Sequence, residues 1–142
     1  MTAGSTSSSA PHTSVSFDYE SGRAAGTSLL ARPRAERPTA IFASSDQQAL
    51  GCLRAANDLD IPVPAGLSIV GFDGVPLSNL ITPRLTTIVQ PKQQIAEAAI
   101  SAPLGQRDMP PMGAPDLFQC ELALRVSSAG PVVEPTALTA SR

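Results

Sequence analysis

Apolar residues in the first part of the chain follow two different periods. Between Tyr19 and Pro33 they recur at helical spacing, at Ala24, Ala25, Leu29 and Leu30. Pro33 ends this pattern, because proline disrupts a helix interior. Residues 39–43 (TAIFA) instead form a short apolar run between polar neighbours, which is typical of a strand buried on both faces. We therefore predict a helix from about Tyr19, followed by a strand with a central place in a sheet.

The next segment, residues 44–59, begins with a helix start signal. Ser44 can cap the helix with Gln47 three residues later, and Asp46 falls in the first turn, where its charge complements the helix dipole. The apolar stripe of this helix is expected at Leu50, Leu53 and Ala56. We predict an amphipathic helix over this range.

A second strand follows that helix closely. The prolines of residues 61–64 (IPVP) end the helix, and residues 68–72 (SIVGF) form another apolar run. Strand, helix and strand within about thirty-five residues make a βαβ unit, which requires a parallel sheet.

Three further elements complete the pattern. Residues 85–89 predict a third strand, and a short helix is expected from Gln93 to about Ser101, before Pro103 ends it. After a proline-rich connector, residues 117–126 alternate enough between apolar and polar side chains to predict an edge strand. The predicted fold class is α/β, a partial, mostly parallel sheet flanked by helices.

Both ends of the chain differ from this middle region. Residues 1–15 are rich in Ser and Thr without apolar periodicity, and residues 130–142 also lack it, so we expect two disordered tails. Residues 16–129 are left as one domain. With 42% hydrophobic and 15% charged residues, the composition suits a soluble domain.

Charge and cysteine content exclude several classes of function. Ten Lys and Arg against twelve Asp and Glu give a net charge of −2, and the basic residues are scattered, so this segment itself is not expected to bind DNA. Cys52 and Cys120 have no partner at metal-ligand spacing, which predicts ordinary thiols and no metal. Neither a signal peptide nor an apolar span is recognisable, which predicts a cytoplasmic protein without membrane contact.

Polar residues follow each of the three predicted parallel strands. Ser45 with Asp46, then Asp73, and finally Gln90 come just after strand ends, where ligands bind in open parallel sheets. Hydroxyl, carboxylate and amide groups together suit the rim of a polyol site. The alternative is structural: Ser45 and Asp46 as a helix cap, Asp73 as part of a turn with Gly74, and Gln90 as a hydrogen-bonded side chain.

Catalysis is not expected. His12 is the only histidine and lies in the predicted tail, and Ser45 is not in a G-x-S-x-G nucleophile elbow. No glycine-rich phosphate loop follows a predicted strand, so neither a nucleotide nor any other cofactor is predicted.

Residues 38–91 resemble the effector-binding core of the LacI/GalR family of bacterial transcriptional regulators. The blocks PTAIFASSDQQALG, SIVGFDG and TPRLTTIVQP follow the family pattern P-T-A-I-F-x-x-N-D, A-L-G, S-V-V-G-F-D-D and T-P-x-L-T-T-I-x-Q-P in order and spacing. Residues 17–22 and 121–128 extend the resemblance on either side. It implies part of the C-terminal lobe of a periplasmic-binding-protein-like (type I) domain, which senses a small sugar or related polyol.

The resemblance also implies roles for individual residues. Ser45 stands where the family has an effector-binding Asn, Asp73 where it has the Asp that grips a sugar hydroxyl, and Gln90 at the hinge crossing, with Asp46 beside them. Phe17 occupies the place of an aromatic residue that stacks on a ring. Positions at which family members pair their subunits as homodimers are Leu50, Arg54, Leu77, Leu80 and Ile81. Core packing is the alternative for these five.

Departures from the pattern limit what carries over. Ser45 lacks the amide of the family Asn, Gly74 replaces a second Asp, and Pro103 shortens a helix. The N-terminal lobe and the helix-turn-helix headpiece are missing from these residues, so operator DNA would be bound only through that headpiece. A solute-binding receptor of the same fold and a truncated product without function are the alternatives.

Overall fold

The computed structural model describes residues 16–101 and 117–130. In chain order the elements are α1 (Tyr19–Leu30), the 3-10 turn η1 (Arg34–Glu36), β1 (Ala40–Phe42), α2 (Asp46–Asp58), β2 (Ser68–Asp73), the 3-10 turn η2 (Pro76–Asn79), β3 (Thr86–Val89), α3 (Lys92–Ser101) and β4 (Glu121–Ala123). The predicted disordered tails, Pro103 and the proline-rich connector lie outside the described residues, apart from Gly130.

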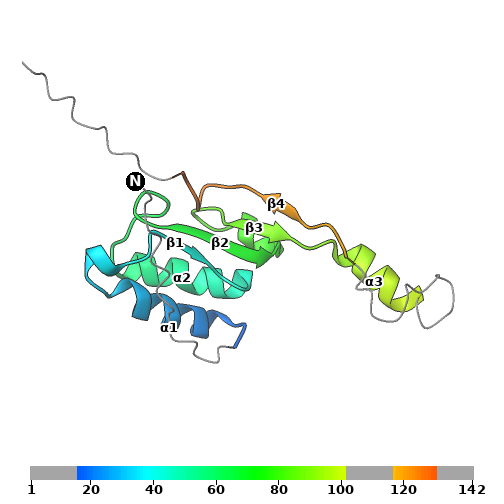
Figure 1. The fold of residues 1–142 in the computed structure, drawn as a ribbon, viewed down its shortest axis with the longest axis horizontal. Helices are drawn as coiled ribbons and strands as arrows, with labels where there is room; N and C mark the ends of the chain where they lie inside the picture. The colour runs from blue at the N-terminus through cyan, green and yellow to red at the C-terminus, as the bar shows by residue number, and fades with distance from the viewer. Residues whose placement is uncertain (1–15, 102–116, 131–142) are drawn as a thin grey trace, which may run out of the picture.

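The strands form one sheet in the order β1-β2-β3-β4. β1, β2 and β3 run parallel, and β4 lies antiparallel to β3 at the edge. Figure 1 shows α1 and α2 on the same side of this sheet. The predicted α/β fold with a mostly parallel sheet is therefore confirmed, as is the edge position of the last strand.

Helix α2 packs against β2, and α1 packs against α2. The two helices approach very closely at glycines: a Cβ added at Gly51 would lie 2.2 Å from the carbonyl oxygen of Tyr19, and one at Gly22 would lie 2.3 Å from that of Gln48. Any side chain at these positions would push the helices apart. The absence of side chains thus allows α1 to cover the outer side of α2.

The core lies between α2 and the sheet. Its larger members are Leu30, Leu67, Ile69 and Leu85, all 2% exposed or less. Helix α2 contributes small side chains, namely Ala49, Cys52, Ala55 and Ala56. Of the predicted apolar stripe Ala56 is fully buried, whereas Leu50 and Leu53 are not, because the close approach of α1 and β2 leaves room only for small residues there. Both leucines are half-buried, and Leu53 packs against the border of this core.

The prediction of a central, doubly buried first strand is also wrong. β1 is the end strand of the described sheet, and Phe42 on it is 62% exposed. The physical reason is that, among the described residues, helices cover only one face of the sheet and no strand pairs with the outer edge of β1.

Two smaller corrections concern helix starts. The N-cap of α2 is Ser45 rather than Ser44, since the Ser45 side chain accepts a hydrogen bond from the backbone N–H of Gln48. Helix α3 begins at Lys92, one residue before the predicted start. It projects away from the sheet (Figure 1), and none of its residues is buried.

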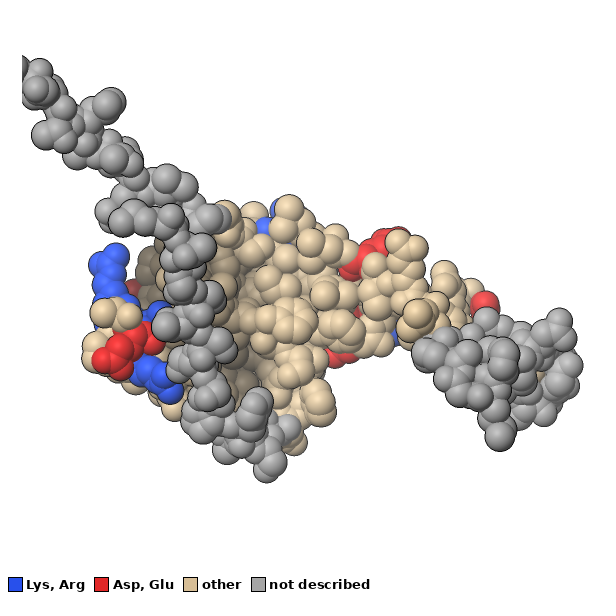
Figure 2. All heavy atoms as spheres, viewed as in Figure 1, with Lys and Arg blue, Asp and Glu red and all other residues tan. Residues whose placement is uncertain are grey.

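Charged side chains gather toward the two ends of the described part on the face seen in Figure 2, and uncharged residues cover its middle. Within residues 16–101 and 117–130 no helix combines the length and apolar character needed to cross a membrane.

Candidate functional site

The three parallel strands end at one edge of the sheet. Because Asp73 at the end of β2 is in register with Val89 at the end of β3, Gln90 comes directly beside it. Ser45 follows the end of β1 by three residues. The structure therefore brings together at this edge the strand-end residues that the sequence singles out.

Ser45 is already engaged in the protein. Its hydroxyl accepts the capping hydrogen bond from Gln48 N–H at 3.2 Å and donates to the carbonyl oxygen of Phe17 at 3.3 Å. Ser45 is only 4% exposed, whereas Phe17, which precedes α1, is 70% exposed. The cap thus ties the start of α2 to Phe17 and leaves the aromatic ring accessible.

Asp73 and Gln90 form a direct pair. The amide Nε2 of Gln90 donates to Oδ1 of Asp73 at 2.7 Å. Within the described part of the chain, no hydrogen bond engages the other carboxylate oxygen, Oδ2. Asp73 has a φ of 119° and Gly74 a φ of 66°, so the chain turns sharply where β2 ends. A positive φ is strained for a residue with a side chain, and such strain concentrates at functional sites.

Asp46 has a different environment. It is fully buried, its Oδ2 accepts from the backbone N–H of Val75 at 2.8 Å, and its Oδ1 accepts from the Thr87 hydroxyl. Both oxygens therefore have partners inside the protein. A direct effector contact by Asp46 stays a prediction, and the observed contacts are structural.

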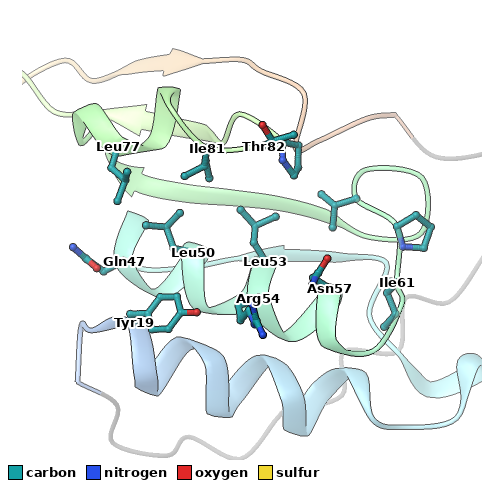
Figure 3. Close-up of a pocket in the computed structure, with 13 residues that line it drawn as sticks. Tyr19, Gln47, Leu50, Leu53, Arg54, Asn57, Ile61, Leu77, Ile81 and Thr82 are labelled. Carbon is teal, nitrogen blue, oxygen red and sulfur yellow. The ribbon is translucent and has the colours of Figure 1, made fainter.

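A groove of about 630 Å³ runs along α2, from its first turn to the segment that follows it. Its walls are α2, the segment after α2 and the segment that carries η2. The lining residues are Tyr19, Gln47, Leu50, Leu53, Arg54, Asn57, Ile61, Pro62, Val63, Leu77, Ile81, Thr82 and Pro83. Figure 3 shows Leu50 and Leu53 pointing toward Leu77 and Ile81 across this groove.

Four of the five predicted subunit-pairing residues line the groove, and the fifth, Leu80, is 77% exposed on η2's C-terminal side. Arg54 forms an ion pair with Asp58 at 2.8 Å, and Arg23 of α1 reaches the same carboxylate at 3.0 Å. The groove therefore has apolar walls with a charged border.

Sequence reasoning missed two groove residues on α2, Gln47 and Asn57. They recur at helical spacing with the predicted pairing residues Leu50 and Arg54, so this spacing is the signal that could have found them.

The cysteine thiols have no site role in the structure. Cys52 is buried against α1 and its Sγ lies 3.4 Å from the carbonyl oxygen of Gly22; Cys120 is exposed. Burial raises the pKa of the Cys52 thiol to about 11. A thiol held protonated in this way is a packing group rather than a nucleophile.

Comparison with known proteins assigns the family. The family described as "Periplasmic binding protein-like domain" matches residues 3–128. The HTH-type transcriptional repressor CytR of Escherichia coli (strain K12) is 40% identical over 113 residues, which are 79% of this chain and 33% of CytR. The repressor PurR of Proteus mirabilis is 42% identical over 85 residues, 60% of this chain and 24% of PurR.

Solved structures agree. An uncharacterized protein from Actinobacillus succinogenes is 37% identical with a TM-score of 0.70, covering 80% of this chain and 41% of that one. The lac repressor dimer bound to operator and the anti-inducer ONPF has a TM-score of 0.71 at 27% identity, over 82% of this chain and 40% of that one.

These matches define a periplasmic binding protein-like domain. The chain belongs to this family, and it is homologous to part of the effector-binding domain of LacI-type transcriptional repressors such as CytR and PurR. Its relatives are transcriptional repressors rather than enzymes. The chain spans about a quarter of PurR and a third of CytR.

Proposed function

We propose that these residues form one side of the effector-binding cleft of a LacI-type transcriptional repressor that senses a sugar or related polyol. The observation that carries the proposal is the Asp73–Gln90 pair at 2.7 Å, with the exposed ring of Phe17 at the same edge of the sheet. A carboxylate with a spare oxygen accepts from a ligand hydroxyl, an amide both donates and accepts, and an aromatic ring packs on the apolar side of a ring-shaped ligand.

In this proposal Ser45 and Asp46 act at the same edge. Ser45 holds Phe17 in place through its carbonyl oxygen, and Asp46 supports the site from inside the protein. Gln90 lies where the chain leaves the sheet for α3, whose residues are all unburied in the described part. That arrangement suits a hinge between two lobes, with α3 beyond it.

The relatives give a panel of probes. A LacI family regulator from Lactobacillus casei was solved with bound sucrose (TM-score 0.66, 27% identical), and one from Arthrobacter was solved in complex with lactose (TM-score 0.68, 25% identical). We therefore propose titrating the 142-residue chain with sucrose, lactose and glucose, following backbone amide shifts by NMR.

The decisive comparison uses two matched substitutions. Asp73→Asn removes the charge that accepts from a hydroxyl and weakens binding about tenfold, which is the cost of one charge-assisted hydrogen bond. Asp60→Asn makes the same chemical change at an exposed aspartate beyond the C-terminus of α2 and leaves binding unchanged. Equal effects of the two variants, or shifts confined to residues away from Ser45, Asp73 and Gln90, would falsify the effector site.

We further propose that the groove pairs two copies of the chain, as a homodimer that contacts operator DNA through a headpiece outside these residues and acts in the cytoplasm. Apolar walls with a charged border suit a subunit interface. The residues proposed to pair are Leu50, Arg54, Leu77, Leu80 and Ile81.

Sedimentation velocity tests this pairing. Leu80→Asp introduces a charge on the 77%-exposed apolar residue beside the groove and is expected to dissociate the dimer. Leu124→Asp, at a 73%-exposed residue next to β4, is the control and leaves the sedimentation coefficient unchanged. A wild-type chain that sediments as a monomer at all concentrations contradicts the pairing.

A further inference from the structure

Asp46 joins three parts of the molecule that are far apart in the sequence. It is the first residue of α2, and its carboxylate accepts from Val75 N–H, 29 residues away, and from the Thr87 hydroxyl, 41 residues away. Val75 belongs to the segment between β2 and β3, and Thr87 belongs to β3. One buried side chain therefore fixes a helix, a strand and a loop relative to one another.

The sheet makes room for this carboxylate. Gly71 of β2 is in register with Thr87, and a Cβ added to Gly71 would lie 2.3 Å from Oδ1 of Asp46. Any other residue at this position would displace the carboxylate from Thr87. The lack of a side chain at Gly71 and the polar side chain at Thr87 are thus matched to a carboxylate at position 46.

Asp46 has no basic partner in the described part of the chain, where both ion pairs involve Asp58. Its charge is instead stabilised by two hydrogen bonds and by the N-terminus of α2. A buried carboxylate is a poor source of stability compared with apolar packing. Hydrogen bonds are directional, so this carboxylate holds the Val75 N–H and the Thr87 hydroxyl at fixed places.

Val75 connects this carboxylate to the wall of the groove. It is the N-cap residue of η2, and its carbonyl oxygen accepts from Ser78 N–H at 3.0 Å and from the Ser78 hydroxyl at 2.6 Å. Leu77, between them, forms part of the groove wall. Asp46 also directly follows Ser45, which lies at the strand-end edge. The same carboxylate therefore lies between the two surfaces.

We infer that Asp46 is a positioning residue that fixes the segment 74–81 against α2 and β3, and thereby links the strand-end site to the groove. The link to effector and dimer rests on the proposed function, but the positioning does not require it.

Amide hydrogen exchange of the full 142-residue chain, measured by NMR, tests the positioning. Asp46→Ala removes both acceptors and is expected to raise exchange at Val75, Ser78 and Leu80 about tenfold more than at the helical amides of α2. Asp46→Asn restores wild-type exchange, because the amide oxygen can accept from Val75 while the amide nitrogen donates to the Thr87 hydroxyl.

The matched control is Ser127→Ala. Ser127 is also fully buried with two hydrogen bonds, from Thr86 N–H at 2.8 Å and to the Ile69 carbonyl oxygen at 2.6 Å, at the opposite end of the same strands. It is expected to raise exchange without preference for the segment 74–81. Uniform exchange in Asp46→Ala, or the same local pattern in Ser127→Ala, overturns the inference.

Thr87→Val provides a second route if Asp46→Ala does not fold. It keeps the shape of the side chain, leaves Oδ1 without its donor, and is expected to loosen the segment 74–81 several-fold. Unchanged local exchange in Thr87→Val overturns the inference as well. Sedimentation of the same variants then asks whether the loosening reaches the groove; a monomeric wild type would count against the proposed dimer and not against the positioning.

Discussion

The two faces of the four-stranded sheet carry similar apolar side chains but differ in what covers them. On one face Ile41, Ile69 and Thr87 lie under α2, and Ile69 is fully buried. On the other, strand alternation and register place Phe42 and Leu122, each 62% exposed. On that same face Thr86, at the start of β3, bonds to the Arg125 carbonyl oxygen and the Ser128 hydroxyl.

This difference teaches where the stability of the described part resides. Parallel strands normally have helices on both faces, and their sequences are apolar on both. Here the described core lies on the face of the sheet that α2 covers. In CytR the region that matches this chain is one third of the polypeptide, so relatives of that length have further residues available to cover such a face.

The largest expected effect comes from truncating one large residue on each face. Ile69→Ala lowers the free energy of unfolding by about 3 kcal/mol, because it leaves a cavity under α2. Phe42→Ala lowers it by less than about 1 kcal/mol, because the ring is mostly in water already. Urea denaturation followed by circular dichroism measures both. Similar losses for the two variants would mean that the open face is covered in solution.

A second contrast uses the two thiols. Cys52 is buried, and with its pKa near 11 it is about one thousandth thiolate at pH 8, whereas Cys120 is exposed. Because burial both hides the Cys52 thiol and keeps it protonated, Cys120 is expected to react with iodoacetamide at least about tenfold faster than Cys52, as measured by mass spectrometry of the labelled peptides.

The same pKa gives a dependence of stability on pH. Because the folded pKa of Cys52 is raised, the unfolded chain releases the thiol proton first as the pH rises. This contribution to stability is fully present below about pH 9 and is lost toward pH 11. Cys52→Ala removes this dependence, and a pH profile of unfolding unchanged by the substitution would contradict it.

A smaller effect is expected at the contact between the helices that close the covered face. Gly51→Ala places a Cβ against the Tyr19 carbonyl oxygen and lowers the free energy of unfolding by about 2 kcal/mol, although alanine favours helix. Gly130→Ala has no atom within 4 Å of the new Cβ and serves as the control, with no measurable change. A stabilised Gly51→Ala variant would show that the two helices can separate without loss.

Local signals in the sequence predicted most elements. Helical spacing identified α1, and the apolar run at residues 68–72 identified β2 almost to the residue. The cap of α2 was misplaced by one residue because Ser44 and Ser45 are chemically equivalent candidates. The prediction of which side of α2 is buried was wrong at Leu50. Hydrophobicity favours Leu50 over Ala49, but the space left by α1 and β2 admits only the smaller residue.

The candidate site also has contacts that the sequence predicts and contacts that it does not. The meeting of Asp73 and Gln90 follows from parallel-strand geometry and was predictable. The contacts of Asp46 were not, because their partners lie 29 and 41 residues away and one of them is a backbone N–H, which leaves no trace in side-chain chemistry.

The helix cap at Ser45 has a consequence for ligand selectivity. A serine has one hydroxyl, and here its proton goes to Phe17 while its oxygen serves Gln48. An asparagine can cap with its carbonyl oxygen and keep two N–H donors for a ligand. With serine in place, this position adds no free donor to the edge, next to the Asp73 carboxylate, which only accepts. In the proposed function, the site therefore favours ligands that bring many hydroxyl protons over ligands that bring carbonyl or carboxylate oxygens.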